Sequence, residues 1–170
     1  MVNPDSAEEL VEIVDRDNNP IGAVTRQIMR QQNLIHRASY VLVFNRDGQL
    51  FIQKRTRTKD IYPGYWDLAA GGVVQAGESY LESAQRELRE ELGVAGVKLT
   101  HLFDQYFEAS DNQVWGRVFF CVSEGPFTLQ REEIDCGRFI DLDAIEALHQ
   151  TEPVTPDGMV ILQRLPRNRR

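Results

Sequence analysis

The sequence predicts an α/β (α+β) fold, in which helices are interspersed among the strands of one mixed β-sheet. Short apolar segments with strand-like alternation recur along the 170 residues, and segments of helical periodicity separate them. Apolar residues make up 42% of the chain and charged residues 26%, which is ordinary for a globular protein. No internal repeat and no linker-like stretch divides the sequence, so we expect one domain over residues 1–170.

The N-terminal part is predicted to contain one strand and one short helix. Residues 1–9 are polar and are expected to form a disordered tail. LVEIVD (10–15) alternates like a strand, and the RDNN that follows it is typical of a turn. RQIMRQQNL (26–34) is compatible with a short helix.

A β-hairpin is predicted in the next segment. SYVLVFN (39–45) and LFIQKR (50–55) have the composition of strands. Asp47-Gly48 lies between them and favours a tight turn. Residues 56–65 contain a proline and a glycine and are expected to form a loop.

The second half of the chain is predicted to add further strands and helices after the helix at residues 79–92. These elements are expected near residues 97–108, 113–123 and 137–140 (strands), and 142–149 and 157–165 (helices). Asp141 is placed to cap the first of these two helices, and the second starts after Pro156. Residues 166–170 are basic and are expected to form a disordered tail.

GESYLESAQRELREELGV (77–94) predicts the helix at residues 79–92. Ser79 followed by Glu82 has the pattern of a capping box, and Gly93 is a typical stop. Four apolar side chains at helical spacing are expected to face the core: Leu81, Ala84, Leu88 and Leu92.

Three glutamates crowd the last two turns of this helix, where helix physics disfavours them. Glu87, Glu90 and Glu91 share one face, and the C-terminal end of a helix already carries partial negative charge. Glu82, Arg86 and Glu90 can form an i,i+4 ladder, which leaves the other two acids without a cationic partner on the helix. Carboxylates gathered on one face are ligands that Mg²⁺ prefers, and a solvated acidic face is the alternative interpretation.

The spacing of residues 72–94 is the strongest functional signal. Gly72 is followed after five residues by Glu78, and after seven more by RELREELGV (86–94). This is the pattern of the Nudix box. The sequence therefore resembles the Nudix hydrolase superfamily, over roughly residues 10–165.

The resemblance implies an α/β/α sandwich around a mixed sheet, with the box folded as loop, helix and loop. It implies a site for Mg²⁺, or Mn²⁺, formed by Glu87, Glu90, Glu91 and the carbonyl of Gly72. Arg86 would orient the acids, and Glu78 would be mainly structural. The implied reaction is attack of water on a phosphorus atom of a nucleoside diphosphate linked to another group, or of another organic diphosphate.

Outside the box, the chain resembles a branch of bacterial hydrolases related to type 1 isopentenyl-diphosphate isomerase. The resemblance lies in EIVDRDNNPIG, HRASYVLVFNRDGQLFIQKR and KDIYPGYWD. A Cys-Gly-His segment of the isomerase, with its proton-donating cysteine and metal-binding histidine, corresponds here to Gly71-Gly72-Val73. Arg117 and Phe119 stand where the isomerase has acidic residues. Alkene isomerisation needs a proton donor and an acceptor, so these replacements favour a hydrolase.

The basic run QKRTRTK (53–59) is predicted to contact the phosphate groups of the substrate. Its candidates are Lys54, Arg55 and Lys59, and the last of these aligns with a diphosphate-contacting lysine of the isomerase. Arg26 is a weaker candidate, and a solvated strand end is the alternative interpretation. His36 aligns with an isomerase metal ligand whose partners are missing here, so we expect a packed or hydrogen-bonded histidine.

A carboxylate must accept the proton of the attacking water. Glu87 is one candidate. QREEIDCGRF offers Glu132 and Glu133 on a later loop, where many Nudix hydrolases have a catalytic glutamate, and we favour Glu133. The alternative is that both are solvated loop acids.

Charge and hydropathy restrict the partners. The net charge of −7 argues against a nucleic-acid polymer, which would need a basic face, but allows a small phosphate compound in a local basic pocket. The start of the chain is polar and acidic, and the longest apolar runs are too short to span a bilayer. We therefore expect a cytoplasmic protein without membrane contact. A homodimer is compatible with the sequence, and an isomerase-like enzyme or a non-catalytic nucleotide-binding module are the alternative functions.

Overall fold

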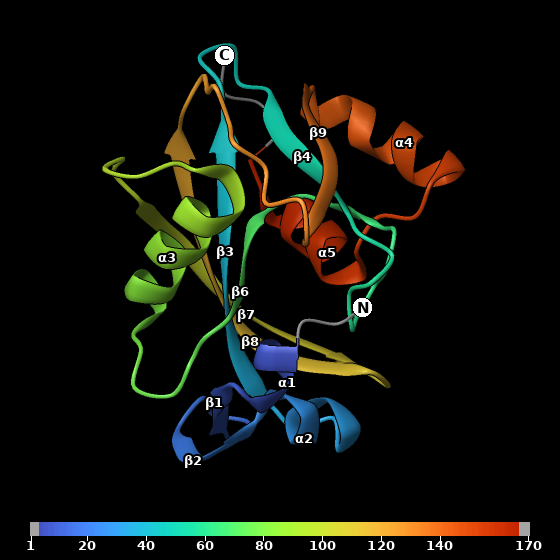
Figure 1. Ribbon diagram of the computed structural model, residues 1–170. Helices are drawn as coiled ribbons and strands as arrows, with labels where there is room; N and C mark the ends of the chain where they lie inside the picture. The colour runs from blue at the N-terminus through green and yellow to red at the C-terminus, as the bar shows by residue number, and fades with distance from the viewer. Residues whose placement is uncertain (1–3, 167–170) are drawn as a thin grey trace.

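The computed structural model describes residues 4–166 and has a mixed β-sheet with helices on both faces (Figure 1). Within this range the sheet has nine strands, which are β1 (Leu10–Val14), β2 (Pro20–Thr25), β3 (His36–Phe44), β4 (Leu50–Arg55), β5 (Trp66–Asp67), β6 (Ala70–Val73), β7 (Thr100–Ala109), β8 (Asn112–Val122) and β9 (Ile134–Ile140). The helices are α1 (Pro4–Glu8), α2 (Arg26–Gln31), α3 (Tyr80–Leu92), the 3₁₀ helix η1 (Leu142–Ala144), α4 (Ile145–Thr151) and α5 (Pro156–Arg164).

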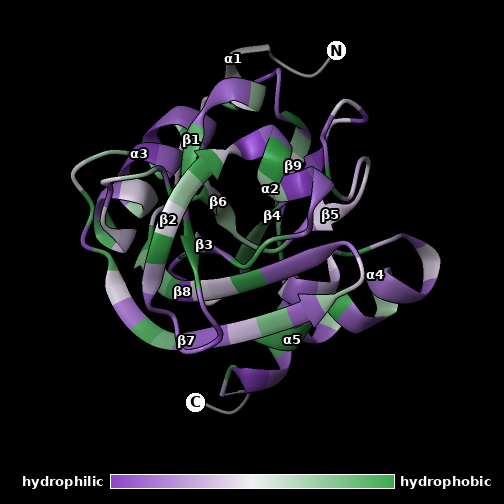
Figure 2. Cartoon of the chain, turned by 90° about the horizontal axis from the view of Figure 1, so that it is seen from below, coloured by the Kyte–Doolittle hydropathy of each residue, from purple (hydrophilic) through white to green (hydrophobic). Residues whose placement is uncertain are grey.

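Two hydrophobic clusters hold α3 and α5 against opposite faces of the sheet. Leu88 of α3 belongs to one cluster with Val41 and Val43 of β3. Ile161 of α5 belongs to the other cluster with Leu42. Successive side chains of a strand point to opposite faces, and β7 and β8 show the resulting bands of hydrophobic and hydrophilic residues (Figure 2). The predicted fold, an α/β/α sandwich around a mixed sheet, is confirmed.

β3 is the central strand of the sheet. It runs parallel to β8 from the pair His36↔Val114 to the pair Phe44↔Val122, and antiparallel to β6. The predicted turn between β3 and β4 forms, but Phe44↔Leu50 is the pair recorded between these two strands. β4 instead pairs with β9 and β5, which leaves β3 free to pair with β6. The predicted hairpin is therefore present at its turn and opens beyond it.

Helix α3 begins and ends as predicted. The Ser79 hydroxyl accepts a hydrogen bond from the N–H of Glu82, and the Glu82 carboxylate accepts one from the N–H of Ser79. Gly93 ends the helix in the left-handed conformation, with φ of 69°. The predicted burial of Leu81 is wrong, because this side chain is 44% exposed and Tyr80 packs into the core instead.

Several short elements lacked a signal in the sequence. β2 contains Pro20 and Gly22, which are poor strand formers, and most of its residues are exposed. β5 and β6 have two and four residues, too few for a periodic pattern. Residues 4–8 form the short helix α1 where a disordered tail was expected. Residues 1–3 and 167–170 of the predicted tails lie outside the described residues.

The helix expected at residues 142–149 is divided into η1 and α4. The predicted cap is wrong, because the Asp141 carboxylate accepts a hydrogen bond from the Gln49 side chain (3.2 Å) and none from the helix. α5 begins with Pro156 in its first turn, close to the prediction. Over residues 4–166, no helix is both long and apolar enough to cross a membrane.

Candidate active site

An acidic cleft of about 760 Å³ lies beside α3 and β6. Its opposite side is formed by two loops, residues 56–65 and residues 123–133. Ten charged side chains define this acidic cleft: Glu9, Arg26, Lys59, Asp60, Arg86, Glu87, Glu90, Glu91, Glu132 and Glu133. Glu87 and Glu133, the candidate and the favoured proton acceptor, therefore line the same space as the third and fourth acids of interest, Glu90 and Glu91.

Glu87 and Glu91 face β6 from successive turns of α3. Glu91 is 6% exposed, and its carboxylate accepts hydrogen bonds from the N–H of Gly71 (3.1 Å) and the side-chain amide of Gln53 (3.2 Å). Glu87 approaches Gly72 so closely that a Cβ atom there would lie 2.8 Å from Glu87 Oε1. A side chain at position 72 would thus displace this carboxylate, which explains why the box needs glycine there.

Burial disfavours the ionised forms of both Glu87 and Glu91. Burial raises the pKa of Glu91 well above its usual range, and the charge of Glu87 raises it further. Burial also raises the pKa of Glu87, although the charge of Arg86 opposes this. Lys59 lowers both pKa values through its charge. Such a pair favours an additional cation.

Arg86 binds three glutamates at once. Its guanidinium donates to Glu78 (2.7 and 3.0 Å), Glu87 (2.9 Å) and Glu90 (3.2 Å). The hydrogen bonds to Glu78 raise the pKa of Arg86 above its usual value. The expectation that Glu87 has no cationic partner on the helix is wrong, because the adjacent Arg86 reaches it. Glu82 does not extend the predicted ladder and caps the helix instead.

Across residues 4–166, no group of three or more His, Cys, Asp or Glu side chains is arranged to hold a metal ion as it stands. On α3, Arg86 holds Glu90, and 46% of the Glu90 side chain is exposed. A metal ion bound by Glu87 and Glu91 would therefore need Glu90 to turn, or backbone and water oxygens to complete the ligand set.

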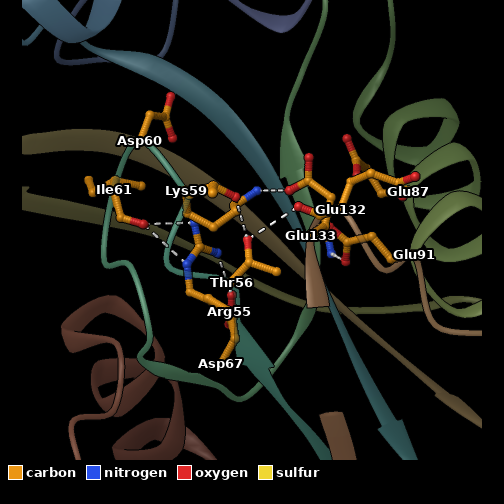
Figure 3. Close-up of polar contacts among 12 residues, drawn as sticks. Arg55, Thr56, Lys59, Asp60, Ile61, Asp67, Glu87, Glu91, Glu132 and Glu133 are labelled. Carbon is orange, nitrogen blue, oxygen red and sulfur yellow. Dashed lines mark hydrogen bonds and ion pairs between the residues drawn. The ribbon is translucent and has the colours of Figure 1, made fainter. Parts of the chain in front are cut away.

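The loop side of the cleft is held together by contacts between distant segments (Figure 3). The N–H of Thr56 donates to the carbonyl of Glu133 (3.1 Å), and the Thr56 hydroxyl donates to the carbonyl of Glu132 (3.2 Å). Lys59 and Glu133 form an ion pair. The structure therefore brings two predicted residues, a phosphate ligand and a base, into direct contact.

A smaller cavity of about 70 Å³ adjoins the acidic cleft, and the two share Arg26, Lys59, Gly71 and Gly72. We name it the arginine cavity, after Arg26, Arg30 and Arg55, which line it together with Lys59, Tyr62, Asp67, Asp157 and other residues. Asp60 accepts hydrogen bonds from Arg26 (3.0 Å) and Arg30 (3.3 Å). Burial opposes the ionised form of Asp60, but these two guanidinium groups hold its pKa far below the usual range.

Two of the predicted phosphate contacts are placed differently from expectation. Lys54 is absent from the lining of both spaces; its ammonium contacts Glu152 (3.4 Å) and lies 5.7 Å from the centre of the Trp66 ring. Arg55 lines the arginine cavity, but its guanidinium is bound to Asp67 (2.9 Å) and to the carbonyl of Ile61 (2.9 and 3.2 Å). The two neighbours therefore have different partners, and the pairing of β4 with β9 is irregular between them.

His36 is packed, as predicted. It is 2% exposed, and Nδ1 lies 3.0 Å from the carbonyl oxygen of Leu34, so this nitrogen carries the proton and donates. Burial, reinforced by the charge of Arg30, lowers the pKa of His36 to about 3.

Sequence reasoning missed Gln53, Gly71 and Asp60 as parts of the site. The one available signal for Gln53 was a polar residue directly after the apolar run Leu50–Ile52, in a strand that proved buried. Asp60 carries no such signal, because its partners Arg26 and Arg30 lie on α2, at least 30 residues away.

Residues 34–160 match the family model of the NUDIX domain, a span that contains α3, β6 and both loops of the acidic cleft. The chain belongs to the Nudix hydrolase family. An uncharacterised Nudix hydrolase of Yersinia pestis is 48% identical over 160 residues, which cover 94% of this chain and 87% of that protein.

Solved structures share the Nudix fold. The DR0079 protein of Deinococcus radiodurans superposes with a TM-score of 0.80 at 24% identity, over 92% of this chain and 98% of that one. The Nudix domain of NrtR from Shewanella oneidensis, solved in complex with ADP ribose, has a TM-score of 0.60 at 14% identity, over 75% of this chain and 83% of that domain. At these identities the likeness concerns the fold.

Proposed function

We propose that this Nudix hydrolase uses Mg²⁺ to hydrolyse a nucleoside diphosphate-linked compound, or another organic diphosphate, by attack of water on phosphorus. The observation that carries the proposal is the pair of buried, repelling carboxylates of Glu87 and Glu91 beside a cavity lined by basic side chains. Membership of the family supports the hydrolase reaction. Mn²⁺ has the same ligand preferences and is an alternative ion.

The donor set fits a hard divalent cation. Glu87 and Glu91 offer carboxylate oxygens, Gly72 offers a backbone carbonyl, and Glu90 lines the same cleft. Arg86 fixes Glu87 by a 2.9 Å hydrogen bond and so orients it toward β6. When bound, the ion supplies activation of water and neutralises negative charge on phosphate oxygens.

We place the phosphate groups of the substrate where the acidic cleft meets the arginine cavity. Arg26 and Lys59 line both the acidic cleft and the arginine cavity, so a phosphate group between them meets two cations. The remainder of the substrate then extends into the arginine cavity, toward Tyr62. A Nudix domain of the same fold binds ADP ribose, and we propose a nucleotide as the substrate class here too.

Glu133 accepts the proton of the attacking water in this proposal, with Glu87 as the alternative. Glu133 lies in the cleft at the end of the loop 123–133, where Lys59 is its partner, whereas Glu87 is held by Arg86 and is itself a proposed metal ligand. As water attacks, its oxygen bonds to phosphorus, the bridging oxygen leaves with its electrons, and the proton passes to the carboxylate.

The structure disfavours the isomerase alternative. Gly71, at the position of the isomerase cysteine, has φ of 144°, and a Cβ atom there would lie 2.0 Å from the carbonyl oxygen of Ser39. A thiol side chain has no room on this backbone. Cys121 is buried, Cys136 is exposed, and neither is among the residues that line the two spaces.

Incubation of the purified protein with Mg²⁺ and a substrate panel tests the proposal. The panel contains nucleoside di- and triphosphates, nucleotide sugars, dinucleotides and isopentenyl diphosphate. We expect release of phosphate, pyrophosphate or a nucleotide from one nucleotide class, and no isomerised alkene. A ligand that raises the melting temperature without being hydrolysed would indicate a binding module instead.

A further inference from the structure

Lys59 stands where the two spaces meet and is already paired. Its ammonium contacts the carboxylate of Glu133, and the two side chains are 16% and 28% exposed (Figure 3). Both residues lie on loops, 74 positions apart in the sequence. The pair therefore joins the two loops of the acidic cleft at its boundary with the arginine cavity.

The loops do not depend on this ion pair for their position. Thr56 holds them together through its N–H, which donates to the carbonyl of Glu133, and its hydroxyl, which donates to the carbonyl of Glu132. The N–H of Gln130 donates to the carbonyl of Glu91 (2.9 Å), which also anchors the later loop to α3. The Lys59 ammonium can change partner while the Glu133 backbone keeps its place.

The same ammonium shares the acidic cleft with the acids of α3. Lys59 and Glu133 line this cleft together with Glu87 and Glu91, so the ammonium lies among carboxylates from both sides of the cleft. Two further cations line the cleft: Arg86 pairs with Glu87 and Glu90 on the helix side, and Arg26 pairs with Asp60. Lys59 supplies positive charge on the loop side of the cleft.

We infer that Lys59 is an exchangeable counter-ion, which neutralises the acidic cleft before binding and moves from Glu133 to a phosphate oxygen when metal ion and diphosphate bind. The inference rests on the proposed function. A divalent ion at Glu87 and Glu91 repels the ammonium, and the diphosphate attracts it. The exchange releases the Glu133 carboxylate, so the proton acceptor becomes available when the substrate is in place. Lys59 is thus a positioning residue.

Binding of Mn²⁺ without substrate is the first test. In Lys59→Met the competing charge is gone, so the dissociation constant measured from free Mn²⁺ by electron paramagnetic resonance should fall about threefold to tenfold. Lys59→Arg keeps the charge and should bind Mn²⁺ as the wild type does. Lys54→Met is the matched control, because this lysine pairs with Glu152 outside the cleft, and it should also leave the constant unchanged.

The change of partner is tested by a double-mutant cycle of Lys59→Met and Glu133→Gln on the free energy of unfolding. Coupling between the two positions should be measurable in chelator. It should vanish in Mg²⁺ with methylenediphosphonate, a diphosphate analogue that water cannot cleave. Retention of the coupling in the liganded state would overturn the inference, as would failure of the analogue to raise the melting temperature of the wild type.

An unchanged or higher Mn²⁺ dissociation constant in Lys59→Met would also overturn it. None of these measurements requires turnover. A protein that passes both tests yet hydrolyses nothing would contradict the proposed function and leave the counter-ion role standing. If the protein hydrolyses a diphosphate but its Lys59→Met variant binds Mn²⁺ as the wild type does, only the counter-ion role is contradicted.

Discussion

The two sides of the acidic cleft are built from different kinds of contact. The helix side takes Glu87, Glu90 and Glu91 from five consecutive positions of α3, so helix geometry alone brings them together. The loop side depends on the pair Lys59–Glu133, whose members are 74 positions apart. The positions of the charged groups on the helix side are therefore set by local sequence spacing, whereas those on the loop side depend on the whole fold. The two sides should respond differently to the same kind of substitution.

The largest effect is expected on the helix side. Glu91→Gln removes a charge from the proposed metal site, and we expect turnover to fall at least ~100-fold with the fold intact. Steady-state kinetics with the substrate found in the panel, together with circular dichroism, measure both quantities. Glu82→Gln is the matched control on the same helix, because glutamine also completes a capping box. Turnover that is equal in Glu91→Gln and in the wild type would contradict the metal assignment.

A smaller effect is expected on the loop side, and it should distinguish two neighbouring acids. Glu133→Gln should lower kcat about 10- to 100-fold, because the protein loses its proton acceptor while the metal ion still activates water. Glu132→Gln should change kcat less than about twofold, since it is the carbonyl of Glu132, retained in this variant, that holds Thr56. Equal losses of kcat in the two variants would show that catalysis depends on the total negative charge of the loop and not on one proton acceptor.

Mg²⁺ should stabilise the helix side measurably. At ten times its dissociation constant, an ion that binds the folded state adds about 1.4 kcal/mol, which raises the melting temperature of a chain this size by about 3–6 °C. Calorimetry in chelator and in Mg²⁺ measures this difference. Glu91→Gln should abolish most of the increase, whereas Glu132→Gln should retain it. An identical increase in melting temperature in both variants would show that Mg²⁺ binds away from Glu91.

The framework behind both sides contributes a dependence of stability on pH, which should leave the activity of the site unaffected. The folded state holds His36 neutral with a pKa of about 3, whereas an unfolded histidine has a pKa of about 6.5. The unfolded state therefore binds more protons below pH 6.5. The stability contributed by neutral His36 is complete above that pH and is lost as pH falls toward 3, by about 2 kcal/mol at pH 5.

Urea unfolding at pH 8 and pH 5 measures this loss in the wild type and in His36→Asn. The variant can keep a donor near Leu34 but has no titrating group, so its stability should fall less between the two pH values. His149→Asn, at an exposed position of α4, is the control. Parallel pH curves for wild type and His36→Asn would show that other groups set the acid stability.

The parts that could be predicted from sequence are those with local causes. The limits of α3 follow from Ser79 and Gly93, and the grouping of its acids follows from helical spacing. Leu81 was misplaced, because periodicity gives the angle of a side chain around the helix but not whether the sheet extends beneath its turn.

The parts of the site that the sequence did not predict depend on which distant segments come into contact. Lys54 and Lys59 carry the same charge in one basic run, yet the first contacts Glu152 and the second lies in the cleft. That difference is decided by the pairing of β4 with β9 and by the path of the loop after it, neither of which has a local signal. Asp60 was overlooked for the same reason, since its two arginine partners come from α2.

The C-terminal end of α3 is covered by the loop that precedes β9. The N–H groups of Thr128 and Gln130 donate to the carbonyls of Leu92 and Glu91, and thus satisfy backbone oxygens that a helix end leaves open. The Nudix box is for this reason not a self-contained module in this chain. A chimera that receives residues 72–94 from a relative should inherit its geometry only when residues 126–133 are transplanted with it.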